Sequence, residues 1–363
     1  MFNAMHEILS ARGWAFHVHF MAQGHRERPD AWRNPKIDFP HTYWPDCGHG
    51  THHFNPSLLR HLRSNRPDVL LAGSTFDTFT SIFATYFCRA KTMCAWSEGN
   101  TKTTGKMDGF KGWLKREIFS HYAYIGVPGS DAVKYVALHQ AMTRKRMPKP
   151  VFLPNIVDET RFRPREEYPQ DAIAAMRAKL GIRPGTLHCF IPARLSPVKG
   201  LAPMIELLER EWLANWRITI LGQGELHDAL EALAKERNLA DKIAILPYLP
   251  YDEMPLVYAA SDMMMLPSLY DPNPLSVVEA LHCSLPVALS TQAGNVEEGV
   301  ADGGNGWRLP VLDKEAFKAK LEEVFSADAA ALKRMGRVSH DVNAQFWNTR
   351  RSITAFLDAV GAT

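Results

Sequence analysis

Short apolar runs alternate with amphipathic stretches along the second half of the chain, and this alternation limits the fold more than any other feature. The expected strands are Leu187–Ile191, Arg217–Leu221, Ile243–Leu246, Met263–Leu266 and Pro286–Leu289. The expected helices lie near 201–210, 225–237, 252–260, 275–283 and 314–325. Strands joined by helices through short loops predict a parallel, doubly wound α/β sheet. Such sheets bind ligands at the carboxyl ends of their strands, so we expect a site in the loops that follow them.

The first half shows the same pattern less regularly. Its expected strands are Val69–Ala72, Thr92–Trp96 and Tyr122–Val127. The aromatic segment 76–88 is expected to be a core helix, and residues 30–56 are expected to form a loop. The chain opens on a helix around Met5–Leu9, followed by a strand at Ala15–Phe20. An α/β domain would usually open on a strand.

The length of the chain and a change in its composition around residues 150–168 predict two domains. A chain of 363 residues suits two α/β domains better than one core. Around 150–168 the sequence becomes polar and irregular, which is typical of a domain boundary. We therefore expect an N-terminal domain at 1–163, a C-terminal domain at 164–345 and a terminal helix within 346–363, spanning Phe346 to Leu357.

Composition and charge exclude several classes of protein. Apolar residues make up 46% and charged residues 22%, as in ordinary globular proteins, and the net charge of +3 is too small to indicate a nucleic-acid partner. The five cysteines have no Cys-x-x-Cys spacing, so buried reduced thiols are expected rather than a zinc site or disulfides. Without a signal peptide or an apolar run of the roughly 18 residues that cross a bilayer, we expect a cytoplasmic protein.

Two loops carry residues suited to a nucleotide. Arg194 and Lys199 flank a turn between a strand and a helix, where cations and backbone N–H groups suit a diphosphate. A solvated loop with ordinary surface charges explains them equally well. After the next strand, Gly222 and Gly224 would let the backbone approach a ligand. Their spacing is too short for a dinucleotide fingerprint, and a plain tight turn is the simpler interpretation.

The loop after the fourth of the expected strands carries two carboxylates around a helix start. Asp271 precedes a helix that begins near Pro274 or Leu275, and Glu279 lies about one turn into it. The N–H groups of Leu275 and Ser276 suit phosphate, and the carboxylates suit the hydroxyls of a ribose or a sugar. The alternative is an acidic N-cap pattern that only stabilises the helix. Because several such loops follow the strands of one sheet, we expect them to converge on one crevice.

These residues resemble the retaining glycosyltransferases of family 4, among the group 1 glycosyl transferases. That family has the GT-B fold, in which two Rossmann-like domains face each other across a cleft. The matching motifs are Arg194…Lys199-Gly200, Gly222-Gln223-Gly224, Pro267-Ser268, Asp271-x7-Glu279-Ala280, Gly294…Glu297 and an interdomain turn at Leu153-Pro154-Asn155…Phe162. They cover roughly residues 150–310 in the expected order. In this fold the terminal helix commonly crosses back to the N-terminal domain, as we expect of residues 346–363.

The resemblance implies a role for each position. Arg194 and Lys199 would hold the donor diphosphate and stabilise charge on the departing nucleotide, so we expect neither a metal nor another cofactor. Glu279 would bind the ribose, and Asp271 would lie near the donor sugar. The other implied donor-binding residues are Gly222, Gly224, Tyr248, Leu249, Asn273, Pro274, Leu275 and Ser276. Two positions depart from the family: Asp271 is one methylene shorter than the usual Glu, and Pro274 replaces a Gly and removes one N–H donor.

The first half matches the family less well. Relatives usually begin with a strand and a Gly-rich loop facing the acceptor, whereas this chain starts on the following helix, so its start is either truncated or reshaped. Glu98 ends an expected strand and is our acceptor-side catalytic candidate, with a surface acid as the alternative.

The segment from Asn100 to Phe119 is both basic and aromatic. Cations alternate there with large apolar side chains. The cations are Lys102, Lys106, Lys111, Lys115 and Arg116, and the apolar residues are Phe110, Trp113, Leu114 and Phe119. A surface of this kind suits contact with anionic lipid, and a solvated helix that packs its aromatics into the domain is the alternative.

The leading hypothesis is a hexosyltransferase. It would move a hexosyl group from a UDP- or GDP-sugar to a glycan or lipid-linked glycan, with retention, in the biosynthesis of a surface polysaccharide or lipopolysaccharide. The expected partners are this donor, this acceptor and, peripherally, the inner face of the cytoplasmic membrane. The alternatives are a nucleotide-sugar-binding protein with little or no transferase activity, or another GT-B enzyme such as an epimerase or a phosphorylase. The basic pair disfavours the epimerase, and the chain length disfavours the phosphorylase.

Overall fold

The structure is a computed structural model that describes residues 1–22, 37–49, 52–73, 78–102 and 107–362. The chain forms two compact units. The first unit comprises Met1–Asn155 together with Thr349–Thr363, and the second unit comprises Ile156–Asn348. The division after Asn155 falls slightly before the boundary expected at 163.

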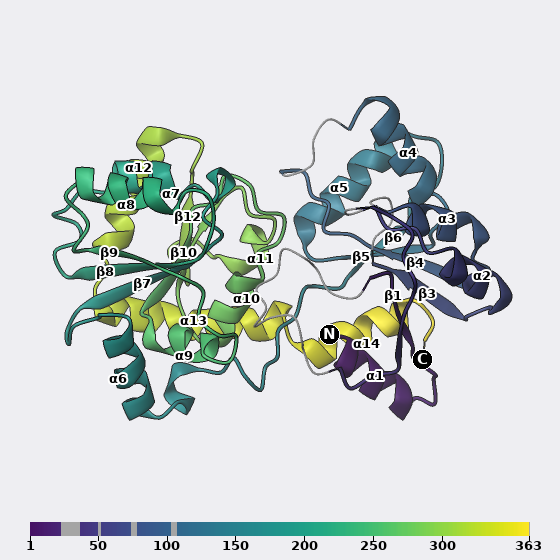
Figure 1. Ribbon diagram of the computed structural model, residues 1–363, viewed down its shortest axis with the longest axis horizontal. Coiled ribbons are helices and arrows are strands. Elements are labelled where there is room, and N and C mark those ends of the chain that lie inside the picture. Colours follow the sequence, from purple (N-terminus) through teal and green to yellow (C-terminus); the bar gives the residue numbers. More distant parts are fainter. Residues whose placement is uncertain (23–36, 50–51, 74–77, 103–106, 363) are drawn as a thin grey trace. The chain divides into compact units, whose positions relative to one another are not determined.

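The second unit is built on a six-stranded parallel sheet (Figure 1). Its strands are β7 (Leu187–Pro192), β8 (Trp216–Leu221), β9 (Ile243–Leu246), β10 (Met263–Leu266), β11 (Val287–Ser290) and β12 (Gly306–Leu309). They lie in the order β12-β11-β10-β7-β8-β9, and every neighbouring pair is parallel. The first five are the strands expected from the sequence, within a residue or two at each end. The sixth, β12, was not among the strands expected from the sequence.

Helices connect these strands. They are α6 (Gln170–Lys179), α7 (Leu201–Leu207), α8 (His227–Glu236), α9 (Met254–Ala260), α10 (Leu275–His282), α11 (Val296–Gly299), α12 (Lys314–Phe325) and α13 (Ala329–Phe346). Asp313 and Asp328 cap α12 and α13, because each side chain accepts a hydrogen bond from a backbone N–H of the first turn. Short 3₁₀ turns lie at Arg165–Glu167 and Pro197–Lys199.

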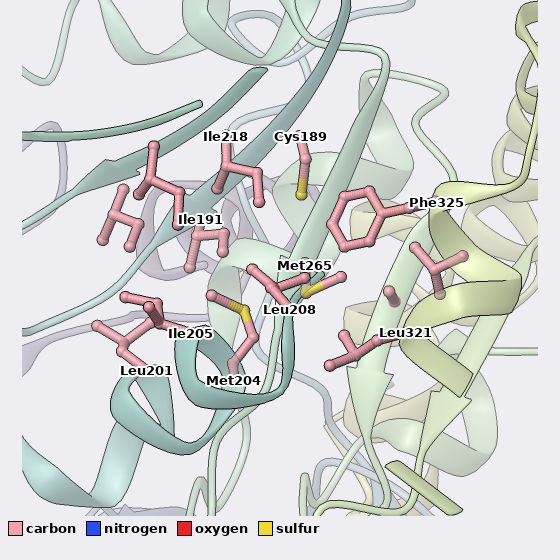
Figure 2. Close-up of a cluster of buried hydrophobic side chains, with 14 of the residues drawn as sticks. Cys189, Ile191, Leu201, Met204, Ile205, Leu208, Ile218, Met265, Leu321 and Phe325 are labelled. Carbon is pink, nitrogen blue, oxygen red and sulfur yellow. The ribbon is translucent and has the colours of Figure 1, made fainter. Parts of the chain in front are cut away.

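The core of the second unit lies between the sheet and the helices that cover it. Figure 2 shows Cys189, Ile191, Ile218 and Met265 from the strands facing side chains of the helical segments. The labelled helical partners are Leu201, Met204, Ile205, Leu208, Leu321 and Phe325. Burial of these apolar side chains is the main force that holds the strand ends, and the loops beyond them, in place.

The first unit contains a four-stranded parallel sheet in the order β3-β4-β5-β6. Its strands are β3 (Val69–Ala72), β4 (Thr92–Trp96), β5 (Tyr124–Val127) and β6 (Lys149–Phe152). Its helices are α1 (Phe2–Ala11), α2 (Pro56–Ser64), α3 (Phe79–Phe87), α4 (Gly109–Phe119), α5 (Ser130–Ala141) and α14 (Thr349–Ala359). A separate parallel pair joins β1 (Val18–Phe20) to β2 (His41–Tyr43). The strand β2 corrects the expectation of a loop throughout 30–56.

The last helix packs within the first unit, against α1 and β6. Arg12, just after α1, donates a hydrogen bond to the carbonyl oxygen of Ala362 at 2.8 Å, and its guanidinium lies 2.8 Å from a carboxylate oxygen of Asp358. The helix expected from Phe346 is in fact broken at Trp347 and Asn348, between α13 and α14. The buried ring of Trp347 marks this break.

The expectation that segment 76–88 is a core helix was wrong for most of its aromatic residues. Residues 76 and 77 lie outside the described part of the chain. In α3 the large aromatic side chains are exposed, and the buried positions are held by Thr80, Ser81, Ala84 and Thr85. Apolar composition suggested a buried helix, but the small residues face the protein instead. Among the helices that the structure describes, none is both long and apolar enough to cross a membrane.

Candidate active site

The strand order of the second unit reverses between β7 and β10, because β8 and β9 extend the sheet on one side and β11 and β12 on the other (Figure 1). In a doubly wound sheet, the loops at such a reversal leave a crevice at the carboxyl ends of the strands. Lys199 follows β7 and Asp271 follows β10. The Lys199 ammonium lies 2.6 Å from an Asp271 carboxylate oxygen, so the two residues meet at this reversal.

Glycines bring the loops at this edge into close contact. Gly200 has a left-handed backbone with φ of +65°, and a Cβ there would lie 2.0 Å from the carbonyl oxygen of Pro267. A Cβ on Gly222 would lie 1.8 Å from the carbonyl oxygen of Ala193, and one on Gly224 would lie 2.3 Å from that of Leu195. The absence of side chains at Gly222 and Gly224 therefore serves loop packing, as in the simpler interpretation of their spacing.

Backbone hydrogen bonds complete this packing. The amide of Leu195 donates to the carbonyl of Gln223 at 3.0 Å, and the amide of Leu269 donates to that of Val198 at 2.8 Å. Farther along the sheet, the Gly294 amide donates to the carbonyl of Asp271 at 3.0 Å. The loops after β7, β8, β10 and β11 thus form one connected edge, which fixes Lys199 and Asp271 on a rigid support.

Arg194 lies near Tyr248. Arg194 is exposed just beyond β7, while Tyr248 and Leu249 are partly exposed beyond β9. Burial raises the pKa of the Tyr248 phenol, and the nearby Arg194 charge and a hydrogen bond with the Gln223 backbone oppose that rise. The structure therefore brings together three loops that the sequence assigned to one site.

The Glu279 carboxylate is held in position by a hydrogen bond from a buried tyrosine. The hydroxyl of Tyr258, on α9, donates a hydrogen bond of 2.6 Å to the Glu279 carboxylate on α10. Desolvation raises the pKa of Glu279 to about 7, and the Tyr258 hydrogen bond partly offsets the rise. The buried Tyr258 ring is fixed in turn by edge contacts with Phe162 and Phe190, at centroid distances of 5.7 and 5.1 Å. This carboxylate is consequently positioned before any ligand arrives.

Several polar groups in these loops have hydrogen-bonding capacity to spare. Asn273 is 7% exposed, and within the described residues neither polar atom of its side chain has a hydrogen-bond partner. The buried hydroxyls of Ser196 and Ser268 share this property in the same part of the chain. Buried polar groups normally have partners, so these three side chains suit a polar ligand or bound water.

The start of α10 follows the expectation from the sequence. Pro274 precedes the helix as its N-cap, and Leu275 and Ser276 form its first turn. The side-chain amide of Asn295 donates to the Pro274 carbonyl at 3.1 Å and anchors this start. The first N–H groups of a helix have no partner within it, so they suit an anion.

Glu98 belongs to the first unit, just after β4. The side-chain amide of Asn155 donates a hydrogen bond to its carboxylate. The residue is partly exposed, and the contact with Asn155 ties it to the end of the first unit's main segment. Glu98 is thus more constrained than an ordinary surface acid, while its catalytic role stays a prediction.

The basic, aromatic segment from Asn100 to Phe119 partly fits each expected alternative, a helix packed into the domain and an exposed surface. Phe119 is buried, and Lys115 and Arg116 donate hydrogen bonds within the unit, to the Tyr135 hydroxyl and the Met107 carbonyl. By contrast, Phe110 and Trp113 are exposed and stack on each other. Lys106 lies outside the described residues. One side of α4 therefore packs into the unit, and the other carries an exposed aromatic pair.

Sequence reasoning missed Tyr258, Ser196 and Ser268. Tyr258 lies in an apolar stretch whose helical pattern is fully explained by burial, and the only signal was that a buried tyrosine hydroxyl needs a partner. The two serines follow strand ends but belong to no distinctive spacing. Among the described residues, no group of three or more His, Cys, Asp or Glu side chains is arranged to hold a metal ion. The expectation that no metal is needed stays a prediction.

Residues 173–339, which contain this edge, match the family described as "Glycosyl transferases group 1". The resemblance to group 1 glycosyltransferases is confirmed. One curated relative is a D-inositol 3-phosphate glycosyltransferase from Streptomyces bingchenggensis, 28% identical over 55% of this chain and 45% of its own length. The chain thus matches less than half the length of that relative. Membership of family 4 in particular stays a prediction.

Solved structures confirm the GT-B fold class. A glycosyltransferase from Rickettsia africae has a TM-score of 0.76 at 15% identity, covering 99% of this chain and 92% of its own. HepE from Anabaena, in complex with UDP and glucose, has a TM-score of 0.68 at 17% identity. The match covers 90% of this chain and 87% of the HepE chain. At these identities the similarity establishes the fold alone.

Proposed function

We propose that this chain is a retaining glycosyltransferase that moves a hexosyl group from a UDP- or GDP-sugar to a glycan or lipid-linked glycan. The observation that carries the proposal is the meeting of Lys199 and Asp271 at the reversal of a parallel sheet, within a group 1 glycosyltransferase match. The UDP and glucose bound by HepE, a protein of the same fold, support the choice of donor class. Assignment to surface polysaccharide or lipopolysaccharide biosynthesis belongs to this proposal.

Each residue would act on a different part of the donor. Glu279 would accept hydrogen bonds from the ribose hydroxyls, and the first turn of α10 would face a phosphate. Arg194 and Lys199 would offset the charge that develops on the diphosphate as its bond to the anomeric carbon breaks. The acceptor hydroxyl would form the new bond to that carbon and pass its proton to the departing diphosphate, which leaves on the nucleoside. Asp271 would lie beside the transferred sugar, and no metal would be required.

Thermal stability with a panel of sugar nucleotides tests the donor site. Binding to the folded state raises the melting temperature, by an amount that grows with the logarithm of the ligand excess over its dissociation constant. We expect one nucleotide class to raise it, and Arg194→Ala and Glu279→Ala to abolish the effect. Arg334→Ala, an exposed arginine on α13, is the matched control and should respond as the unmodified chain does.

Turnover separates the two remaining hypotheses. Release of nucleoside diphosphate with a glycan acceptor, or slow donor hydrolysis without one, would support a transferase. Binding without turnover on any acceptor would favour a nucleotide-sugar-binding protein. The absence of any thermal shift with UDP- or GDP-sugars would overturn the donor site itself.

A further inference from the structure

A cavity of about 270 Å³ lies within the second unit, apart from the candidate donor site. Its lining comes from residues 159–167, from the end of α10 and from residues 340–348 around the end of α13. The helices α10 and α13 pack against each other (Figure 1). Because α10 begins at the donor edge with Leu275 and ends at the cavity with His282, the two sites lie about 10 Å apart along this helix.

Two buried polar side chains are hydrogen-bonded to each other at the cavity. The amide nitrogen of Asn343 donates to Nδ1 of His282 at 2.9 Å, so the proton of the neutral ring is on Nε2. Asn343 is 6% exposed and His282 is 7% exposed. Within the described residues, neither Nε2 of His282 nor Oδ1 of Asn343 has a hydrogen-bond partner. The pair therefore offers one buried donor and one buried acceptor.

The chemistry of this pair favours a hydroxyl group as its partner. Buried polar groups normally have partners, because an unpaired one loses its hydrogen bonds to water. A hydroxyl can accept from the Nε2–H group of His282 and donate to Oδ1 of Asn343 at the same time. An ammonium group can only donate and an ionised carboxylate can only accept, so either would leave one atom of the pair unpaired.

The charged groups of the lining do not favour an anion. The carboxylates of Glu159 and Glu167 line the cavity together with the guanidinium of Arg163. Burial lowers the pKa of His282 to about 4, so its ring carries no charge at neutral pH. The carboxylates thus outnumber the guanidinium, while all three groups can bind hydroxyls.

The remaining lining and the size of the cavity suit a small ligand with apolar faces. Phe162, Pro164 and Ala344 supply the apolar part of the lining. Phe162 is buried, and its ring is fixed by edge contacts with those of Tyr251 and Tyr258. Binding sites for small molecules usually occupy about 300–1,000 Å³, so this cavity suits a ligand at the small end of that range.

We propose that this cavity binds a monosaccharide, either free or as the terminal unit of a glycan. One sugar hydroxyl would bridge Nε2 of His282 and Oδ1 of Asn343, and others would donate to the carboxylates of Glu159 and Glu167. The C–H groups of the sugar ring would pack against Phe162. The inference goes beyond the proposed transfer reaction, because the described residues assigned to the donor and to the acceptor side do not line this cavity.

Saturation-transfer NMR with free sugars tests the cavity without any use of enzyme activity. The full chain is titrated with glucose, mannose, galactose and N-acetylglucosamine. We expect at least one of them to bind with a dissociation constant of about 1–10 mM, as for other ligands of few atoms. Lys199→Ala should bind the same sugar equally well, because Lys199 belongs to the donor edge and not to the cavity.

A substitution at the rim closes the cavity. Ala344 is exposed on α13, and Ala344→Trp should weaken sugar binding by at least about tenfold, because the indole ring would fill the opening. Gln345→Trp is the matched control: Gln345 is the next exposed residue of the same helix but does not line the cavity, so binding should be unchanged. Equal melting temperatures would show that both variants fold.

Two further measurements address the buried pair. Asn343→Ala removes the free acceptor and should weaken sugar binding by about tenfold. In the unmodified chain labelled with ¹⁵N-histidine, the sugar should shift the Nε2 resonance of His282, which is assigned by its loss in His282→Gln. Maltotriose distinguishes the two sources of the ligand, because binding at least as tight as that of glucose would indicate the end of a glycan, and weaker binding would indicate a free sugar.

The proposal fails if none of the four sugars binds, or if Ala344→Trp and Gln345→Trp bind the sugar equally well, since the sugar would then lie elsewhere. Loss of sugar binding in Lys199→Ala would likewise assign the sugar to the donor edge. Inorganic phosphate is the remaining probe. Phosphate binding that is tighter than sugar binding and is abolished by Ala344→Trp would identify the cavity as an anion site instead.

Discussion

The Lys199 ammonium and the Asp271 carboxylate form an ion pair of 2.6 Å where the sheet of the second unit reverses its strand order. Their side chains are only 23% and 11% exposed, so water screens the pair less than it would on an open surface. A donor diphosphate and Asp271 would both attract the same lysine. The ion pair therefore places a carboxylate in competition with the proposed ligand.

Asp271→Asn should strengthen nucleoside diphosphate binding while lowering turnover. The substitution keeps the shape of the side chain but removes the competing charge, and we expect a dissociation constant lower by roughly threefold to tenfold. Lys199→Ala should instead weaken binding and reduce turnover by about 100-fold, through loss of a charged hydrogen-bond donor. Calorimetry with UDP and GDP gives the binding constants. Weaker binding by Asp271→Asn would show that the carboxylate does not compete.

Binding of a sugar nucleotide should strengthen as the pH rises through 7. The pKa of Glu279 is raised to about 7, so the carboxylate is protonated below this pH and ionised above it. If the ribose binds the ionised form, affinity at pH 6 should be about tenfold lower than at pH 8. A sugar nucleotide is the right probe because its diphosphate, esterified at both ends, has no second ionisation near neutral pH.

Variants of Glu279 and of its hydrogen-bond partner Tyr258 identify the titrating group. Glu279→Gln should bind more weakly at pH 8 and lose the pH dependence. Tyr258→Phe should move the transition to higher pH, because the Tyr258 hydrogen bond lowers the pKa of Glu279. A transition that stays in place in both variants would assign the titration to another group.

Gly200→Ala should destabilise the second unit by about 2–4 kcal/mol. The left-handed backbone and the approach of Pro267 both oppose a side chain there. Gly185→Ala is the matched control: its φ is +78°, but no atom lies within 4 Å of an added Cβ, so only backbone strain of about 1 kcal/mol is expected. Urea unfolding measures both. Equal losses would mean that the loop packing contributes nothing beyond backbone strain.

Arg12→Ala should loosen the last helix. The substitution removes the hydrogen bond to Ala362 and the ion pair with Asp358, and we expect a loss of about 1 kcal/mol. Hydrogen exchange should quicken in α14 and α1. Asp358→Asn keeps the hydrogen bond to Ala362 and should have a smaller effect. Equal exchange rates in α14 and α1 of the unmodified chain and both variants would rule out this role for Arg12.

The sequence predicted the second unit well because its strands are fully buried. Where strands and helices alternate regularly, a short apolar run such as Met263–Leu266 is readily identified as a buried strand. The loops that follow such strands could therefore be assigned to the candidate site before their geometry was known. The pairing of Lys199 with Asp271 could not be predicted, because it depends on which strands are neighbours rather than on their order along the chain.

Side-chain orientation was the main source of error in the first unit. The aromatic residues of α3 predicted burial, yet Phe79 and Tyr86 face solvent, because composition alone does not say which side of a helix meets the sheet. In the candidate site, Tyr258 escaped notice because a buried aromatic residue is explained by packing alone.

The return of α14 to the first unit has a consequence for synthesis on the ribosome. Residues 156–348 are continuous and can fold as soon as they emerge, whereas the first unit lacks a helix until α14 has been made. The first unit therefore begins before the second unit along the chain and is completed after it. Until then, the surface that α14 covers on α1 and β6 remains open to the nascent chain and to chaperones.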